Sequence, residues 1–289
     1  MFPLLDELPE KYKSNPRLVH TIKIKTAEQG RKWINGLEIL DQELFVVNER
    51  SSEVEVYDSI KFTLSRRWTL KELIRPLDIG SCNRNKCIYI FDYKDLGQSK
   101  EIFRIDPRGE IIKKWSTGDD WGIGLSVTDE SNVILAVYKN KLNEYSPDGQ
   151  LIREIDLSLV ADISTTTHAM KLNSDHFMVS LCVGENLHTL CIVDADGKLK
   201  KSLCEKCRSI IGEMTSPVSF SVDENKFVLV ADKSNSRVLL LDSELNYRRE
   251  ILSKEETPAL QFPWRTLLDE SNGRLFVSDN QRIFIFQFR

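Results

Sequence analysis

The residues of this sequence that could act as catalysts or metal ligands are few and dispersed. The four histidines lie in separate segments of the chain: His20, His168, His176 and His188. No GxSxG elbow, HExxH helix or Walker loop occurs. The carboxylate pairs Asp129-Glu130 and Asp269-Glu270 stand in polar segments typical of turns, which indicates turn chemistry rather than acid–base catalysis. We therefore predict a protein that is not an enzyme and that uses no cofactor and no metal.

The cysteines offer only a weak alternative to this prediction. The chain has six: Cys82, Cys87, Cys182, Cys191, Cys204 and Cys207. A structural zinc ion needs four ligands with short spacings, and only Cys204 and Cys207 have the CxxC spacing. Cys82 and Cys87 should face each other across a turn, where a disulfide or half of a weak metal site is conceivable. Reduced thiols are the favoured interpretation in a reducing compartment.

Composition and terminal sequence indicate such a compartment. The chain has 289 residues, of which 41% are hydrophobic and 29% charged, with a formal net charge of −4. This mild acidity argues against nucleic-acid binding as the default function. The N-terminus lacks the basic region of a secretory signal, no apolar run approaches the roughly 20 residues that cross a bilayer, and no N-x-S/T sequon occurs. We predict a cytoplasmic protein without membrane association.

The elements that position these residues are internal repeats. VTDESNVILAV (127–137), VDENKFVLVAD (222–232) and LDESNGRLFVSD (268–279) are similar, and their aspartates at 129, 223 and 269 are 94 and 46 residues apart. A second set of equivalent residues recurs at steps of 40 to 48: Tyr57, Ile105, Tyr145, Val193, Leu241 and Phe286. Six copies with a period of about 47 residues fill the chain.

Each copy reads as four short strands. Apolar segments such as LFVVN, CIYIF and RVLLLD are bounded by polar turn residues, and a more charged segment such as EIIKKW follows. Continuously apolar middle strands are expected where neighbouring sheets cover both faces. We therefore predict an all-β, six-bladed β-propeller of four-stranded antiparallel blades.

Charged outer strands and a closing strand complete this prediction. Basic pairs recur at matching places, which favours exposed edge strands over a nucleic-acid footprint: Arg66-Arg67, Lys113-Lys114, Lys200-Lys201 and Arg248-Arg249. The last copy supplies three strands, so RLVHTIKIK (17–25) should join the last blade and close the ring. We expect one monomeric propeller domain over residues 17–289, preceded by an extension or linker at 1–16.

The segment ADKSNSRVLLLD resembles the NHL repeat, in which an Asp ends one strand, an Asn lies in the loop and Arg-Val opens the next strand. The matching residues are Asp232, Asn235, Arg237 and Val238. Asp279 and Arg282 repeat the Asp–Arg pair in the last blade, whereas Thr189 stands where the Arg of blade four would be, and Asn48 replaces the Asp of blade one. Asp232, Asn235, Arg237, Asp279 and Arg282 are predicted to stabilise loops through ion pairs and hydrogen bonds.

This resemblance covers about residues 30–289 and is strongest to the NHL propellers of tripartite-motif proteins. It implies an interaction module that binds protein in some relatives and RNA in others, including substrate recognition in a ubiquitin-ligase context. The RING and B-box modules of that family need clustered Cys and His ligands, which this sequence lacks. A ligase activity would have to come from a partner or a longer product.

Some six-bladed propeller enzymes give a competing interpretation. Propeller lactonases and amidating lyases resemble this architecture and hold a metal in the central channel. Only His168 is expected near the channel mouth, at the start of the first strand of blade four, and a single His there is more often a hydrogen-bonded structural residue. A metal-dependent lactonase or lyase is therefore the second alternative function.

The preferred function is binding of a protein or peptide on one face of the propeller. Residues that lead into the first strands should surround the channel on that face: Asn35, Arg75, Trp121, His168, Trp264 and Arg265. Trp and Arg dominate many interfaces, and the same side chains could stack on unpaired bases. Single-stranded RNA binding on this face is the first alternative. Trp264 could instead pack between blades.

Overall fold

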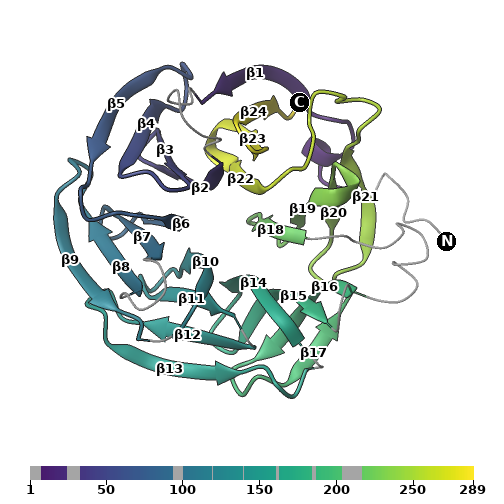
Figure 1. Ribbon diagram of the computed structural model, residues 1–289. Helices are drawn as coiled ribbons and strands as arrows, with labels where there is room; N and C mark the ends of the chain where they lie inside the picture. Colours follow the sequence, from purple (N-terminus) through teal and green to yellow (C-terminus); the bar gives the residue numbers. More distant parts are fainter. Residues whose placement is uncertain are drawn as a thin grey trace.

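The protein forms a ring of six blades around a central channel, as predicted (Figure 1). The structure is a computed structural model that describes residues 8–24, 33–93, 100–118, 120–138, 140–160, 163–183, 187–203 and 217–289. Each blade in this described part is a four-stranded antiparallel sheet whose first strand lines the channel.

The strands of the first three blades follow one another along the chain. Blade one consists of β2 (Ile34–Leu40), β3 (Glu43–Asn48), β4 (Glu53–Asp58) and β5 (Leu64–Thr69). Blade two consists of β6 (Pro76–Cys82), β7 (Cys87–Tyr93), β8 (Lys100–Ile105) and β9 (Ile111–Ser116). Blade three consists of β10 (Gly122–Val127), β11 (Val133–Val137), β12 (Lys141–Tyr145) and β13 (Leu151–Asp156).

The remaining blades repeat this order, except that the last borrows a strand. Blade four consists of β14 (Ile163–Lys171), β15 (His176–Val183), β16 (Leu187–Asp194) and β17 (Leu199–Ser202). Blade five consists of β18 (Pro217–Val222), β19 (Val228–Asp232), β20 (Arg237–Leu241) and β21 (Tyr247–Leu252). Blade six consists of β22 (Arg265–Asp269), β23 (Arg274–Ser278), β24 (Arg282–Gln287) and β1 (Arg17–Lys23).

The closing strand was predicted correctly. β1 pairs antiparallel with β24, from Arg17 opposite Gln287 to Lys23 opposite Arg282. It is the outermost strand of blade six, so the first described strand of the chain completes the last blade (Figure 1). The pairing covers the outer edge of β24 and closes the ring between the first and last parts of the chain.

The hydrophobic core lies between blades rather than in one central cluster. The middle strands β3, β7, β11 and β19 are almost wholly buried, because each sheet is covered on both faces by its neighbours. One of the apolar clusters, for example, joins Phe45 and Val47 of blade one to Ile88 and Ile90 of blade two. Such contacts between successive blades fix the ring.

The basic pairs lie on the outermost strands, as predicted, where carboxylates of neighbouring segments partner them. Arg67 ion-pairs with Glu55 at 3.1 Å, and Lys200 with Asp194 at 2.8 Å. Lys114 pairs with Glu72. These charges therefore cover blade edges.

Glycine turns that follow the third and fourth strands differ in how closely they are packed. Gly109 has φ +91°, and a Cβ at this position would lie 2.6 Å from Cγ of Trp68 in the preceding blade. Gly118 has a similar backbone, φ +68°, but a Cβ added there would have no atom within 4 Å among the described residues. At Gly109, therefore, both the positive φ and the contact with Trp68 disfavour a side chain. At Gly118 only the positive φ does.

We expect Gly109→Ala to lower the free energy of unfolding by about 2–4 kcal/mol, because it combines an unfavourable φ with a clash against a buried ring. Gly118→Ala is the matched control and should cost only about 1 kcal/mol. Urea denaturation of both variants measures the difference. Equal losses would contradict the role of the Trp68 contact.

The segment before β1 is also packed on the propeller. It contains a short 3-10 helix, η2 (Glu10–Tyr12), and the side chain of Tyr12 is completely buried. The sequence predicts an extension or linker for residues 1–16; residues 8–16 lie against blades five and six, with Leu8 and Tyr12 in the same apolar cluster as Leu229 and Phe286. Residues 1–7 lie outside the described part.

Helix is almost absent from the described residues. Besides η2 it comprises only η3 (Lys233–Asn235) and η4 (Glu270–Asn272). None of these three-residue turns has the length or apolar character needed to span a membrane.

Candidate functional site

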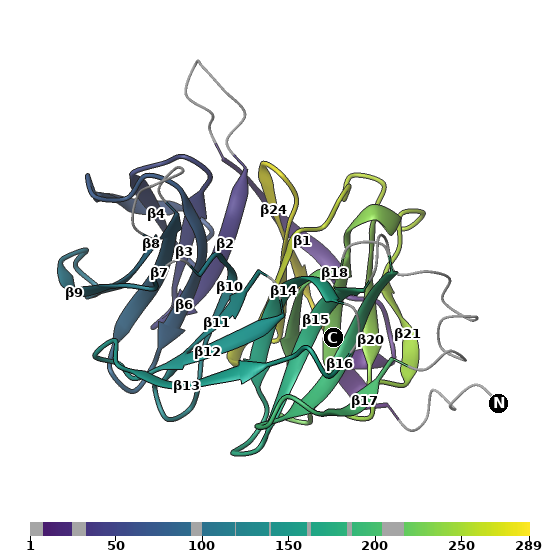
Figure 2. The same cartoon turned by 60° about the horizontal axis from the view of Figure 1, so that its bottom comes forward.

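Two faces of the ring differ in their side chains. We call one the loop face: it is formed by the connections between the second and third strands and by the segments that lead into each first strand. We call the opposite one the turn face: it carries the turns between first and second strands (Figure 2). The side chains that precede the first strands stand on the loop face, next to the channel.

Three aligned positions on the loop face hold a Trp or an Arg. Trp33, Arg75 and Trp121 each accept a backbone hydrogen bond from the second strand of the blade or the residue that follows it, at 2.7, 3.1 and 2.7 Å. Trp264 also directly precedes a first strand, β22, but its backbone N–H donates to the carbonyl oxygen of Ser278 at 2.7 Å. Trp33 was not singled out from the sequence, although its place before the first strand of blade one was a sufficient signal.

Arg75 and Trp121 meet in one group of side chains, which we call the aromatic cluster: Arg75, Tyr93, Trp121 and Tyr138. The Trp121 ring stacks on Tyr93, with centroids 5.1 Å apart and an interplanar angle of 7°, and it contacts Tyr138 at 5.6 Å. The Arg75 guanidinium lies 5.8 Å from the centroid of the Tyr93 ring. Neither tyrosine was predicted from the sequence, although both follow or end the second strands of successive blades.

Trp264 occupies a more sheltered position than Trp121. Its side chain is partly buried, and the ammonium group of Lys233 lies 4.3 Å from its ring centroid. Burial lowers the pKa of Lys233. Trp264 Nε1 has no hydrogen-bond partner among the described residues. Trp264 thus combines packing against the loop of blade five with partial access from outside.

The most exposed aromatic side chains in the described residues all belong to the loop face. They are Trp33, Trp121, Tyr138 and Phe262, with exposed fractions of 38–47%. Trp33 and Phe262 also line a cavity of about 520 Å³ where blades six and one meet, together with Ile24 and Arg282. A gathering of exposed aromatic rings on one face is the usual mark of an interaction surface.

Two cations in the described part of the loop face are paired with carboxylates. Arg75 contacts Glu49 at 2.9 Å, and Lys141 contacts Asp120 at 2.8 Å. These two cations are therefore less available to phosphate groups.

The predicted loop-stabilising residues make short-range contacts in blades five and six. Asp232 accepts hydrogen bonds from Asn235 Nδ2 and Arg237 Nε, both at 2.8 Å. Asp279 accepts from Arg282 Nε at 2.8 Å and from the Arg282 backbone N–H, also at 2.8 Å. Each carboxylate therefore ties the start of the third strand to the end of the second.

Three residues expected on the loop face are buried instead: His168 and Arg265 line the channel, and Asn35 Nδ2 donates to the carbonyl oxygen of Pro76 in blade two at 2.8 Å. Asn35, His168 and Arg265 are only 7, 7 and 5% exposed, because they belong to the inner strands themselves rather than to the segments before them. His168 stands well inside β14, not at its start. These side chains cannot contact a macromolecule on the outer surface.

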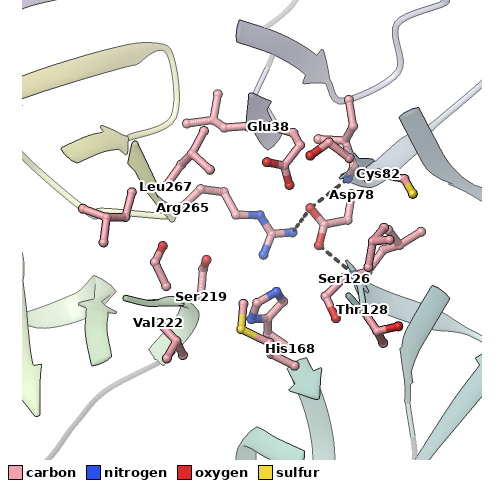
Figure 3. Close-up of a pocket in the computed structure, with 18 of the residues that line it drawn as sticks. Glu38, Asp78, Cys82, Ser126, Thr128, His168, Ser219, Val222, Arg265 and Leu267 are labelled. Carbon is pink, nitrogen blue, oxygen red and sulfur yellow. Dashed lines mark hydrogen bonds and ion pairs between the residues drawn. The ribbon is translucent and has the colours of Figure 1, made fainter. Parts of the chain in front are cut away.

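Arg265 crosses the channel and links several blades (Figure 3). Its Nε donates to the carbonyl oxygen of Asn35 at 2.6 Å, and its Nη2 lies 3.2 Å from Oδ1 of Asp78. Asp78 also accepts the backbone N–H groups of Ile79 and Leu125, at 3.0 and 2.9 Å. The result is a buried ion pair that joins blade six to blades one, two and three.

Asp78 and its neighbour Glu38 were not predicted from the sequence. Burial raises the pKa of Asp78 to about 6 and that of Glu38 to about 7. The available signal was a carboxylate within an otherwise apolar first strand, in INGLEIL and PLDIGSC. A charged group in such a strand must face the channel or be paired.

In the described residues, neither the cysteines nor any group of potential metal-ligating side chains forms a further candidate site. Cys82 and Cys87 are opposite one another in the β6–β7 hairpin, as free, buried thiols. No group of three or more His, Cys, Asp or Glu side chains that could hold a metal ion occurs within the described ranges. Cys204 and Cys207 lie outside those ranges.

Comparison with known proteins identifies the architecture. No family model matches the chain, and no curated protein sequence does either. A solved protein of unknown function from Bacteroides caccae is similar at 14% identity, with a TM-score of 0.62 over 82% of each chain. The WD40 β-propeller domain of Doa1 is similar at 13% identity, with a TM-score of 0.60 over 94% of this chain and 96% of that one.

A third similar structure is an enzyme. Hydrazine synthase from Kuenenia stuttgartiensis has 11% identity and a TM-score of 0.62, over 89% of this chain and 95% of that one. At such identities the likeness extends to the fold and not to the chemistry. The chain is therefore a six-bladed β-propeller by its own structure, with solved structures of similar fold.

Proposed function

We propose that this propeller is a non-catalytic interaction module that binds a protein or peptide partner on its loop face. The observation that carries the proposal is the concentration of exposed aromatic side chains there, with Trp121 at the centre of the aromatic cluster. Trp and Tyr supply large contact areas at low cost in side-chain entropy, and Arg adds directional hydrogen bonds.

The finer assignment to the NHL type belongs to this proposal. It is supported by the Asp232, Asn235 and Arg237 contacts, which follow the resemblance noted in the sequence. In a cytoplasmic setting the module would present a bound substrate to a separate catalytic component, such as a ubiquitin ligase. Propellers serve such roles because their loops vary while the blades stay fixed.

Single-stranded RNA is a less favourable ligand for the same face. Its bases could stack on Trp121 and Tyr138, but its phosphates would need unpaired cations, and Arg75 and Lys141 are already paired with carboxylates. The protein partner is therefore the preferred occupant.

We expect Trp121→Ala to weaken partner binding by about 2 kcal/mol, roughly 30-fold in Kd, because a central exposed Trp is a typical hot spot. Ile112→Ala is the matched control: Ile112 is 52% exposed, but it lies on the outer strand β9. Partners are captured with the wild-type protein, and their affinity for each variant is then measured by calorimetry.

Three outcomes decide this proposal. Loss of affinity in Trp121→Ala and in Arg75→Ala, with no change in Ile112→Ala, supports it. Unchanged affinity in both loop-face variants would exclude this face. Recovery of RNA instead of protein, with a steep dependence of affinity on salt concentration, would favour the RNA alternative.

A further inference from the structure

The channel contains a cavity of about 480 Å³ that the proposed loop-face function does not use. Every blade contributes a polar side chain from its first strand: Glu38, Asp78, Ser126, His168, Ser219 and Arg265. The cavity extends to residues 82–84 and 128–129, which belong to the turn face. Its volume is in the range of small-molecule sites in proteins.

The charges inside the cavity do not balance. Arg265 is already engaged by Asp78, and Glu38 is a second carboxyl group beside them (Figure 3). At the turn-face end the cavity is lined by one cation and one carboxylate, Arg84 and Asp129. Burial and the neighbouring Asp78 raise the pKa of Glu38 to about 7, as expected for a carboxyl group without a cation of its own.

His168 adds a polar atom that lacks a partner. His168 is only 7% exposed, and its imidazole ring packs edge-on against the Phe220 ring, with centroids 4.7 Å apart. Nδ1 is buried without a hydrogen-bond partner among the described residues. Burial and the nearby Arg265 lower the pKa of His168 to about 3, so the ring is neutral. The ring points into the cavity, toward Arg265 (Figure 3).

These features define the ligand by its chemistry. A carboxylate inside a cavity that lacks a counter-ion favours a cation, and an unpartnered imidazole nitrogen favours a hydroxyl group. An anion would meet Glu38 and Asp78, while the guanidinium of Arg265 is already occupied. We propose that the cavity binds a small primary amine that also carries hydroxyl groups, with its ammonium group at Glu38 and a hydroxyl group at Nδ1 of His168.

A matched set of three probes tests this site by calorimetry. Glucamine, sorbitol and gluconate share a six-carbon polyhydroxyl chain and differ in carrying a positive, no, or a negative charge. Glucamine should bind with a Kd on the order of 1 mM or below, and the other two about tenfold more weakly or worse. Between about pH 6 and about pH 8 the affinity for glucamine should rise about tenfold, as Glu38 loses its proton.

Side-chain variants identify the contacts. Glu38→Gln keeps the shape of the side chain and should lower the affinity for glucamine at least about tenfold, with loss of its pH dependence. His168→Phe keeps the ring packing and should lower it about threefold. Trp121→Ala, on the loop face, is the control and should bind glucamine as the wild type does.

Three results would each overturn the proposal. They are equal affinities for the three probes, an unchanged affinity for glucamine in Glu38→Gln, and no saturable binding of glucamine to the wild-type protein. None of them bears on the loop-face partner, because the cavity and the aromatic cluster share no residue.

Discussion

Replacing Asp78 by alanine should lower the free energy of unfolding by about 3–5 kcal/mol, because it leaves the buried guanidinium of Arg265 without its counter-ion. The two side chains are 5 and 6% exposed, so water solvates little of the charge that is left without its partner. Asp78 also accepts backbone N–H groups from blades two and three, and these donors would be left unpaired in the channel. Guanidinium or urea denaturation measures the loss.

Two further variants distinguish the cost of leaving one buried charge unpaired from the net contribution of the ion pair. Asp78→Leu with Arg265→Met removes both charges and should cost much less than the sum of the single changes, since the desolvation of both ions is also removed. Glu72→Ala breaks an exposed pair with Lys114 and should cost about 1 kcal/mol or less. Additive losses in the double variant would contradict the assignment of Asp78 and Arg265 as one unit.

The same pair has a pH signature with a definite sign. Burial raises the folded-state pKa of Asp78 from its ordinary value near 4 to about 6. The folded protein therefore binds protons more readily than the unfolded chain in this interval. The extra stability that comes from this tighter proton binding is complete below about pH 4 and is lost as the pH rises through about 6. This part of the pH dependence should be absent from the double variant.

The blades could be predicted because their determinants are local. Apolar strands, polar turns and a period of about 47 residues are visible in the sequence, and the fold follows from covering both faces of each sheet. The Asp232 network was equally accessible, since its carboxylate, amide and guanidinium groups lie within six consecutive residues. Local spacing is sufficient where the partners are neighbours in the chain.

The channel could not be predicted in this way. Asp78 and Arg265 meet only because the ring closes, and nothing in the sequence between them indicates their contact. Adjacent residues also separate sharply: Trp264 is on the loop face, whereas Arg265 points into the channel. Successive side chains of a strand point to opposite sides, so an error of one residue changes the predicted environment completely. The same error placed Asn35 on the outer face.

The N-terminal segment illustrates a further limit. Its position before the closing strand predicts an extension or linker, whereas the burial of Tyr12 depends on side chains of blades five and six that only the folded ring brings together. The Tyr12 ring contacts Phe227 and Phe288, with centroids 5.5 and 5.4 Å away, and its hydroxyl group donates to Asp223 at 2.9 Å. Arg249 in turn donates to the Tyr12 carbonyl oxygen at 3.0 Å.

We therefore expect Tyr12→Ala to lower the free energy of unfolding by about 3–5 kcal/mol, as for other buried aromatic rings that leave a cavity. Tyr12→Phe retains the ring, and Asp223 keeps its ion pair with Lys11 at 3.0 Å, so this control should lose only about 1–2 kcal/mol. Chemical denaturation ranks the variants, and limited proteolysis reports whether residues 8–16 are released. If Tyr12→Ala is as stable as the wild type, residues 8–16 are not docked in solution and act as the linker predicted from the sequence. The predicted order, with alanine well below phenylalanine, would instead make this segment part of the closure of the ring, because it covers the junction of the blade that β1 completes.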